Sequence, residues 1–173
     1  MLFRSPCVLW MDEIEKGIGG GDSDDGVSRR LLGTLLTWLA EHKSGVFIVA
    51  TANDIERLPP ELLRKGRLDE IFFVDLPDQE NRGAIFSIHL RSRNLAPSGF
   101  DMERLAWASD GFTGAGIEQV VVAALYTARA QGATLDDRHL LEELERTQPL
   151  SVVMAERIQY LRDWARERTV PAD

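Results

Sequence analysis

The stretch CVLWMDE, residues 7–13, joins a short apolar run to two adjacent carboxylates. Two further apolar runs follow it along the chain, VFIVAT at 46–51 and IFFV at 71–74. Runs of this length are typical of buried strands in a parallel sheet. Between the first two runs, leucines recur at helical spacing and predict an amphipathic helix over 28–42. This alternation of strands and helices indicates an α/β layer fold.

After Pro77 the pattern becomes helical, and no further strand is predicted. Asp78 can cap the first of these helices, Thr134-x-x-Asp137 resembles a capping box, and Ser151 opens the last helix. The helices expected before that last one cover about 78–93, 102–109, 114–131 and 135–147. The second half of the chain is therefore expected to be a small helical bundle.

The bulk composition narrows the class of protein. The chain has 173 residues, 44% of them hydrophobic and 28% charged, which fits one globular domain or one domain with a small appendage. A net charge of −8 argues against a nucleic-acid binder, and the apolar runs are too short to span a bilayer. Cys7 is the single cysteine and is expected to be a small buried hydrophobe. The sequence MLFRSP at the start does not resemble a signal peptide. We expect a soluble, intracellular protein.

The strand ends carry the first candidate site. Asp12 and Glu13 follow the first run, at the edge where open α/β sheets bind their ligands. Asn53 ends the second run and would lie beside Glu13 if the two strands are neighbours. The alternatives are a solvated acidic pair and a turn asparagine, respectively.

Two further segments are candidates for contacts with an anion. Arg64 and Arg67 lie in LLRKGRLDE, residues 62–70, and guanidinium groups suit phosphate. The alternative is a surface cluster paired with nearby carboxylates. The glycine-rich stretch GFTGAG, residues 111–116, opens the longest helix of the second half, and its glycines would let a ligand or another backbone approach closely. Tight helix packing is the alternative.

Two other features favour no site. The glycine- and aspartate-rich segment 17–26 lacks the glycine register and the closing glutamate of a calcium loop, so a solvated loop is expected. The histidines at 42, 89 and 139 share no metal-ligand spacing and are expected at the surface.

The order of these motifs resembles the AAA branch of the P-loop ATPases over nearly the whole chain. WMDEIEKG, FIVATAND, LPPELLRKGRLDEIFFVDLP and GFTGAGIEQ further resemble an AAA group known from cyanobacteria and as a reading frame of some chloroplast genomes. The resemblance implies an incomplete parallel-sheet αβα AAA core at 1–77, a helical lid domain at 78–150 and a C-terminal helix at 151–173.

The resemblance also implies a role for each strand-end residue. Asp12 would be the Walker B ligand that holds Mg²⁺ through water, and Glu13 would polarise the attacking water. Asn53 would be the sensor of the γ-phosphate. Arg64 and Arg67 would be arginine fingers that reach the neighbouring subunit of a ring, where such a finger can be worth roughly 10³–10⁵ in rate.

From the helical part, the same resemblance implies that Gly114 and Ala115 abut the bound nucleotide. The partners it implies are ATP, Mg²⁺, further copies of the chain in a homo-oligomeric ring and, as the usual output of the family, a protein substrate. No nucleic acid and no membrane are expected. The implied location is the cytoplasm, or the chloroplast stroma for a plastid-encoded chain.

One motif of the family is missing. No Gly-Lys-Ser or Gly-Lys-Thr occurs in the chain, so the phosphate loop G-x-x-x-x-G-K-[ST] is absent and the chain is expected to be inactive alone. Without the strand that precedes this loop, we expect the isolated chain to fold poorly or to associate through open sheet edges. Two alternatives remain: a non-enzymatic module that lends Arg64 and Arg67 or a scaffold to a partner ATPase, and a domain whose acidic pair has no function.

Overall fold

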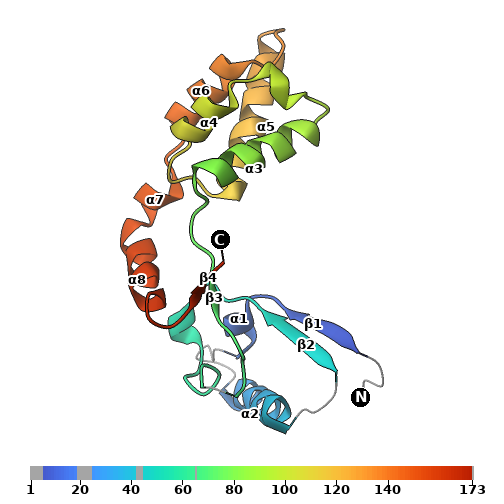
Figure 1. Cartoon of the computed structure of the whole chain (residues 1–173), viewed down its shortest axis with the longest axis vertical. Coiled ribbons are helices and arrows are strands. Elements are labelled where there is room, and N and C mark those ends of the chain that lie inside the picture. Colours follow the sequence, from blue (N-terminus) through green and yellow to red (C-terminus); the bar gives the residue numbers. More distant parts are fainter. Residues whose placement is uncertain (1–5, 19–24, 42–44, 65, 173) are drawn as a thin grey trace. The chain divides into compact units, whose positions relative to one another are not determined.

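The computed structural model describes residues 6–18, 25–41, 45–64 and 66–172. It divides into two compact units, Met1–Ile71 and Phe72–Asp173 (Figure 1). The boundary predicted at residue 77 lies a little further along the chain. His42 and most of the segment 17–26 lie outside the described residues, so the interpretations placed on them stay predictions.

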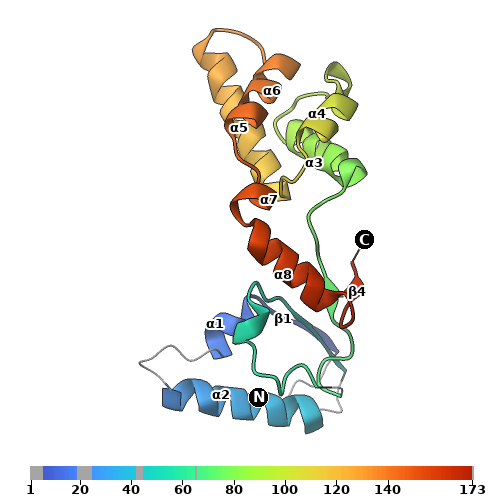
Figure 2. The ribbon, with the colours of Figure 1, turned by 90° about the vertical axis from the view of Figure 1, so that its left-hand side faces the viewer.

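The first unit is built on two parallel strands. β1 (Cys7–Met11) pairs with β2 (Val46–Ala50) over their whole length, with Cys7 opposite Val46 and Met11 opposite Ala50. α2 (Asp25–Glu41) lies between the two strands in the chain, as is usual for the crossover that joins parallel strands (Figure 2). Two short helices complete the unit: α1 (Ile14–Ile18) and the 3₁₀ helix η1 (Ile55–Arg57). The sequence did not predict α1.

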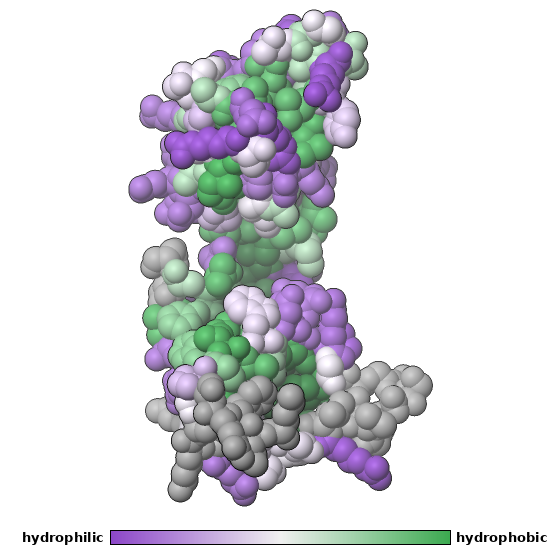
Figure 3. Space-filling view, turned by 90° about the vertical axis from the view of Figure 1, so that its right-hand side faces the viewer, coloured by the Kyte–Doolittle hydropathy of each residue, from purple (hydrophilic) through white to green (hydrophobic). Residues whose placement is uncertain are grey.

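The core of the first unit lies on one side of this sheet. Ile14, Leu58 and Leu62 are buried, and the half-buried leucines of α2 pack against them: Leu32, Leu35, Leu36 and Leu39. Exposed and half-buried residues alternate along β1, whereas Phe47 is the one exposed residue of β2. The exposed set is Val8, Trp10 and Phe47, each between 62% and 68% exposed. Figure 3 shows apolar surface in green on this part of the molecule.

The expectation of buried strands is therefore wrong for the described chain. That expectation was based on the unbroken apolar sequence of the strands, which is usual where helices cover both faces of a sheet. In the described residues only one face of the β1–β2 pair is packed on a core. Cys7, expected to be buried, is half-buried.

The second unit combines a helical bundle with a minimal sheet. The helices are α3 (Gln79–Arg91), η2 (Pro97–Gly99), α4 (Met102–Ala108), α5 (Gly114–Ala130), α6 (Asp137–Arg146), α7 (Leu150–Val153) and α8 (Ala155–Ala165). β3 (Phe72–Phe73) pairs in parallel with β4 (Val170–Pro171). The α/β class with a helical second half is thus confirmed, but the expectation of no strand after Pro77 is wrong, because two residues are too few to show a periodic pattern.

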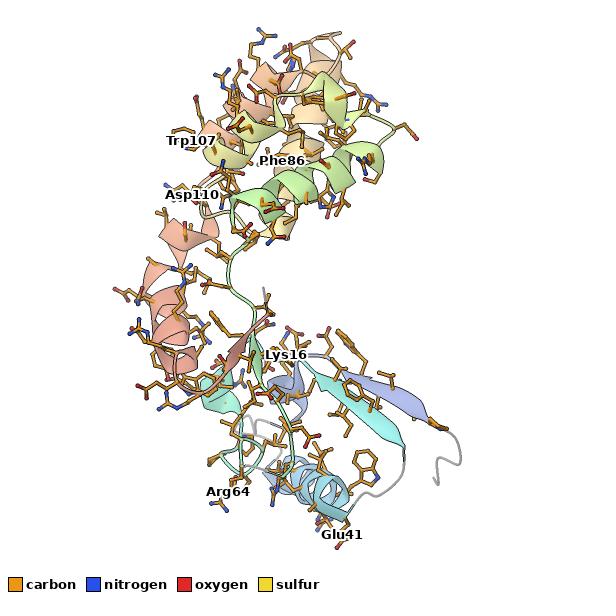
Figure 4. The ribbon with its side chains drawn as sticks, viewed as in Figure 1. Lys16, Glu41, Arg64, Phe86, Trp107 and Asp110 are labelled. Carbon is orange, nitrogen blue, oxygen red and sulfur yellow. The ribbon has the colours of Figure 1, made fainter. Side chains whose placement is uncertain are left out.

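Helices α3 to α6 enclose the core of this unit. Phe86, Leu105 and Leu140 are fully buried, and Figure 4 shows Phe86 among the helices. The remaining core residues are Leu90, Phe112, Ile117, Val120, Val121, Ala124, Ala128, Leu135 and Leu144. The inner face expected for 114–131 is the one that α5 buries.

Local hydrogen bonds set the helix ends. Asp78 caps α3 as expected, accepting from the backbone N–H of Asn81 at 2.7 Å. The capping box expected from Thr134 is wrong, because Asp136 is the residue that caps α6, and His139 takes the place of the usual Glu or Gln. His139 is 1% exposed, so its expected place at the surface is also wrong: its ring turns back onto Asp136 and reaches Gln131 Oε1 at 3.2 Å.

The last predicted helix is interrupted. α7 ends and α8 begins at Met154, whose backbone has φ −122° and ψ 32° rather than helical angles. Ser151, expected to open this helix, lies in the first turn of α7 and donates its backbone N–H to the carbonyl of Gly111 at 3.2 Å.

Candidate functional site

The candidate site lies where β1 and β2 end together. Because the strands are parallel, their carboxyl ends meet at one edge. The ladder continues past both strands: Thr51 donates its backbone N–H to Met11 O at 2.9 Å, and Ile14 donates to Thr51 O at 3.0 Å. This pairing sets Asp12 and Glu13 beside the residues that follow β2.

Thr51 ties the two carboxylate residues together. Its hydroxyl donates to Asp12 Oδ1 at 2.5 Å and accepts from the backbone N–H of Glu13 at 3.0 Å. One oxygen of the exposed Asp12 carboxylate is thereby oriented. Sequence reasoning missed Thr51, although its position directly after the second apolar run was a usable signal.

Both carboxylate oxygens of Glu13 are bonded. Asn53 Nδ2 donates to Oε1 at 2.9 Å, and Lys16 Nζ donates to Oε2 at 2.6 Å (Lys16 is labelled in Figure 4). The hydrogen bond to Glu13 raises the pKa of Lys16 above its ordinary value, with further support from the charges of Glu15 and Asp12 against the effect of burial. Glu13 itself has φ +49°, a left-handed conformation that is uncommon outside glycine. The structure thus brings Glu13 and Asn53 together as expected for neighbouring strands.

Glu15 is a further residue of this site that sequence reasoning missed. It is only 2% exposed, and its Oε1 accepts from the backbone N–H of Asn53 at 3.2 Å. Its Oε2 has no hydrogen-bond partner among the described residues. A single acidic residue in a five-residue helix carries no periodic signal, so the sequence alone could not show that Glu15 is buried.

The two arginines are not joined to this cluster in the described part of the chain. Arg64 is exposed, and Figure 4 shows it away from Lys16 within the same unit. Arg67 is half-buried and donates from its guanidinium to the carbonyl of Glu61 at 3.1 Å. Between them Gly66 has φ +90°, so the segment turns sharply. Neither guanidinium contacts Asp12 or Glu13.

Gly114 and Ala115 lie in the second unit, at the start of α5. Thr113 caps this helix by accepting from the backbone N–H of Gly116 at 3.0 Å. A Cβ on Gly114 would meet Ile85 Cδ1 at 3.7 Å, an ordinary contact, whereas one on Gly116 would lie 3.3 Å from Thr113 Oγ1. Packing therefore restricts Gly116 more than Gly114. Ala115 is exposed.

The donor set of the strand-end cluster fits a hard cation held partly through water. Mg²⁺ in nucleotide sites is usually bound by one or two carboxylates together with phosphate oxygens and waters. Asp12 offers an exposed carboxylate with one oxygen oriented by Thr51. No group of three or more His, Cys, Asp and Glu side chains that could form a complete protein-built metal site occurs within the described residues. An Asp12–water–Mg²⁺ arrangement is compatible with both observations.

Comparison with known proteins shows which family the first half of the chain is similar to. Residues 2–76 match the family described as "ATPase family associated with various cellular activities (AAA)". Residues 2–76 are an AAA-family segment. The parallel strands, the Asp12–Glu13 pair and Asn53 all lie inside it, and so do Arg64 and Arg67.

The similarity to AAA proteins extends beyond this segment. The AAA domain-containing protein ycf46 of Guillardia theta is 45% identical over 164 residues, which cover 93% of this chain and 32% of that protein. Its counterpart from Pyropia yezoensis is 42% identical over 93% of this chain and 33% of its own length. The ATP-dependent zinc metalloprotease FtsH 2 of Bdellovibrio bacteriovorus is 33% identical over 83% of this chain and 24% of its own length.

The chain spans about a third of the length of the ycf46 proteins that it matches. Among the described residues, no helix combines the length and the apolar character needed to cross a membrane.

Proposed function

We propose that this chain carries the water-activating part of a Mg²⁺-dependent ATP hydrolysis site of the AAA type. The observation that supports the proposal most directly is the hydrogen bond from Asn53 Nδ2 to Glu13 Oε1, 2.9 Å long. It joins a general-base candidate at the end of β1 to a phosphate-sensing candidate at the end of β2. Membership of the AAA family is independent support for ATP as the substrate.

Each strand-end residue has a separate task in this proposal. When bound, Mg²⁺ neutralises charge on the phosphate oxygens of ATP. Asp12 holds a water of that ion, and Thr51 keeps the carboxylate oriented through its hydroxyl. Glu13 accepts hydrogen bonds from the attacking water and polarises it. Asn53 holds Glu13 in place and presents the remaining donor of its amide to the phosphate.

The two arginines suit a role between copies of the chain. Neither Arg64 nor Arg67 contacts the acidic pair among the described residues, and Arg64 is directed into solvent. We assign both to a neighbouring subunit's nucleotide in a homo-oligomeric ring, with Gly114 and Ala115 beside the nucleotide of their own subunit. Remodelling of a protein substrate is the output that we propose for the ring.

The test compares this chain with a version extended upstream by the codons that precede Met1. Calorimetric titration with Mg-ATP should show binding only to the extended version, since no phosphate loop G-x-x-x-x-G-K-[ST] occurs in residues 1–173. In that version Glu13→Gln should lower kcat by about 10²-fold or more while ATP still binds. Glu56→Gln changes an exposed glutamate of the same unit and should leave kcat unchanged. Undiminished hydrolysis by Glu13→Gln would remove the base from the proposal.

A second function, favoured by the exposure of Arg64, is donation of arginine to the site of a separate P-loop partner. In that case neither version binds ATP, and adding the chain stimulates the partner's hydrolysis unless Arg64 is replaced by alanine. If neither binding nor stimulation is observed, the acidic pair has no role in ATP chemistry.

A further inference from the structure

The carboxylate of Glu15 is the one buried charged group of the strand-end cluster. Its residue is 2% exposed, whereas Asp12 is exposed and the side chain of Glu13 is 35% exposed. Burying a carboxylate is unfavourable unless its oxygens are hydrogen-bonded. Glu15 Oε1 has a partner, the backbone N–H of Asn53 at 3.2 Å, while Oε2 has none among the described residues. A buried carboxylate with one unpartnered oxygen lowers stability, so stability alone does not explain why Glu15 is at this position.

The partner of Oε1 suggests that explanation. Asn53 is held at two points: its backbone N–H by Glu15, and its side-chain amide by Glu13. Both glutamates follow β1, so the turn after β2 is fastened to the turn after β1 by two carboxylates from the same short segment. The Glu15 contact fixes the main chain at Asn53, and this in turn limits the directions in which the carboxamide can point.

We propose that Glu15 is a positioning residue for the candidate site. It orients Asn53, and through Asn53 it sets the direction of the Glu13 carboxylate toward the attacking water. The inference rests on the proposed function for its effect on hydrolysis, but the Glu15–Asn53 contact itself is independent of ATP. The competing explanation is a purely structural role, in which Glu15 only stabilises α1.

The contact can be tested without nucleotide by NMR on the 173-residue chain. Glu15→Ala should raise the hydrogen-exchange rate of the Asn53 backbone amide by about tenfold, the loss expected for one hydrogen bond, and should shift its side-chain amide signals. Glu15→Gln keeps an acceptor oxygen and should preserve most of the protection. Glu41→Ala, at the exposed end of α2 (Figure 4), is the matched control and should change neither signal. Unchanged Asn53 signals in a folded Glu15→Ala chain would overturn the proposal.

The effect on hydrolysis is tested by a double-mutant cycle in the upstream-extended version. Glu15→Ala should lower kcat by about tenfold with little change in KM, and Glu15→Gln should restore most of the loss. If Glu15 acts through Asn53, Glu15→Ala should cause no further loss in an Asn53→Ala background. Losses that multiply would show a separate, structural role and overturn the inference. If Glu15→Ala fails to fold, the cycle is run with Glu15→Met, which fills similar space but has no acceptor oxygen, and losses that multiply would again overturn the inference.

The two proposals fail in different ways. If the extended protein does not hydrolyse ATP at all, the proposed function is wrong, but the Asn53 exchange rates still decide whether Glu15 positions that residue. If hydrolysis proceeds and depends on Glu13 but not on Glu15, only the positioning role is lost.

Discussion

The two units bury their apolar side chains to very different extents. In the described residues, twelve side chains form the buried core of the second unit, whereas three form that of the first. The first unit also leaves Val8, Trp10 and Phe47 exposed on one face of its strands. The strand-end cluster thus lies in the unit with the smaller described core.

The largest expected effect tests whether each core supports its own unit. Phe86 is fully buried, with 0% of its surface exposed. Phe86→Ala should therefore destabilise the second unit by about 3–5 kcal/mol. Leu62→Ala should act on the first unit instead. Hydrogen exchange resolved by residue measures both variants in the whole chain. If either variant lowered hydrogen-exchange protection equally in both units, the chain would unfold as one cooperative unit. That result would contradict the difference between the two cores.

The next prediction concerns the fit of α7 in the second unit. Gly111 has φ +76°, and a Cβ there would overlap the side chain of Ser151. Gly111→Ala should therefore cost about 2–4 kcal/mol, from backbone strain and overlap together. Gly132 has φ +64° but open space around it, so Gly132→Ala is the matched control and should cost only about 1–2 kcal/mol. Urea unfolding distinguishes the two, and equal costs would show that the overlap is relieved by a shift of Ser151.

A third prediction uses the exposed sheet face. Replacing Trp10 and Phe47 by threonine keeps strand propensity and removes apolar surface, so it should change stability by no more than about 0.5 kcal/mol. Light scattering should show less self-association, since exposed apolar patches favour it. Trp107→Thr, at a similarly exposed site on the helical unit (Figure 4), is the control and should leave association unchanged. If Trp107→Thr reduced self-association and the replacement of Trp10 and Phe47 did not, the surface responsible for association would lie on the helical unit.

The smallest effect is a pH-dependent ion pair of the second unit. Burial raises the pKa of Asp75, but hydrogen bonds from Arg162 and from the backbone N–H of Leu76 outweigh it and leave the pKa below its ordinary value of 3.8. A carboxyl with a lowered pKa stabilises the fold above its unfolded pKa and loses that effect as pH falls through the folded value. Arg162→Met should cost about 0.5–1 kcal/mol at pH 7, because the pair is partly exposed, and progressively less as the pH falls below 3.8. Urea unfolding at pH 7 and at a series of pH values below 3.8 checks this.

The features that the sequence predicted correctly are those that depend on residues close together in the chain. The apolar runs and the leucine spacing predicted β1, β2 and α2, and parallel pairing then implied that Asn53 lies beside Glu13, as it does. The helical bundle was predictable because its buried residues recur over three or four turns. These features depend on local pattern, which a single sequence contains.

The features that were missed depend on one or two residues. β4 has two residues and pairs with a strand nearly a hundred positions earlier, so no local sequence pattern predicts it. His139 is buried because its ring completes a cap at Asp136, an uncommon use of histidine. Glu15 is buried because of a backbone N–H more than thirty residues away. None of these contacts has a periodic signal.

The backbone of Glu13 has a consequence for how this segment can change. Its φ of +49° is strained for a glutamate and easy for glycine or asparagine. Either replacement is expected to relax the turn and to remove the carboxylate that the chemistry needs. A library selected only for thermal resistance should therefore drift toward inactive variants at this position, whereas one selected for turnover should keep glutamate and tolerate the strain.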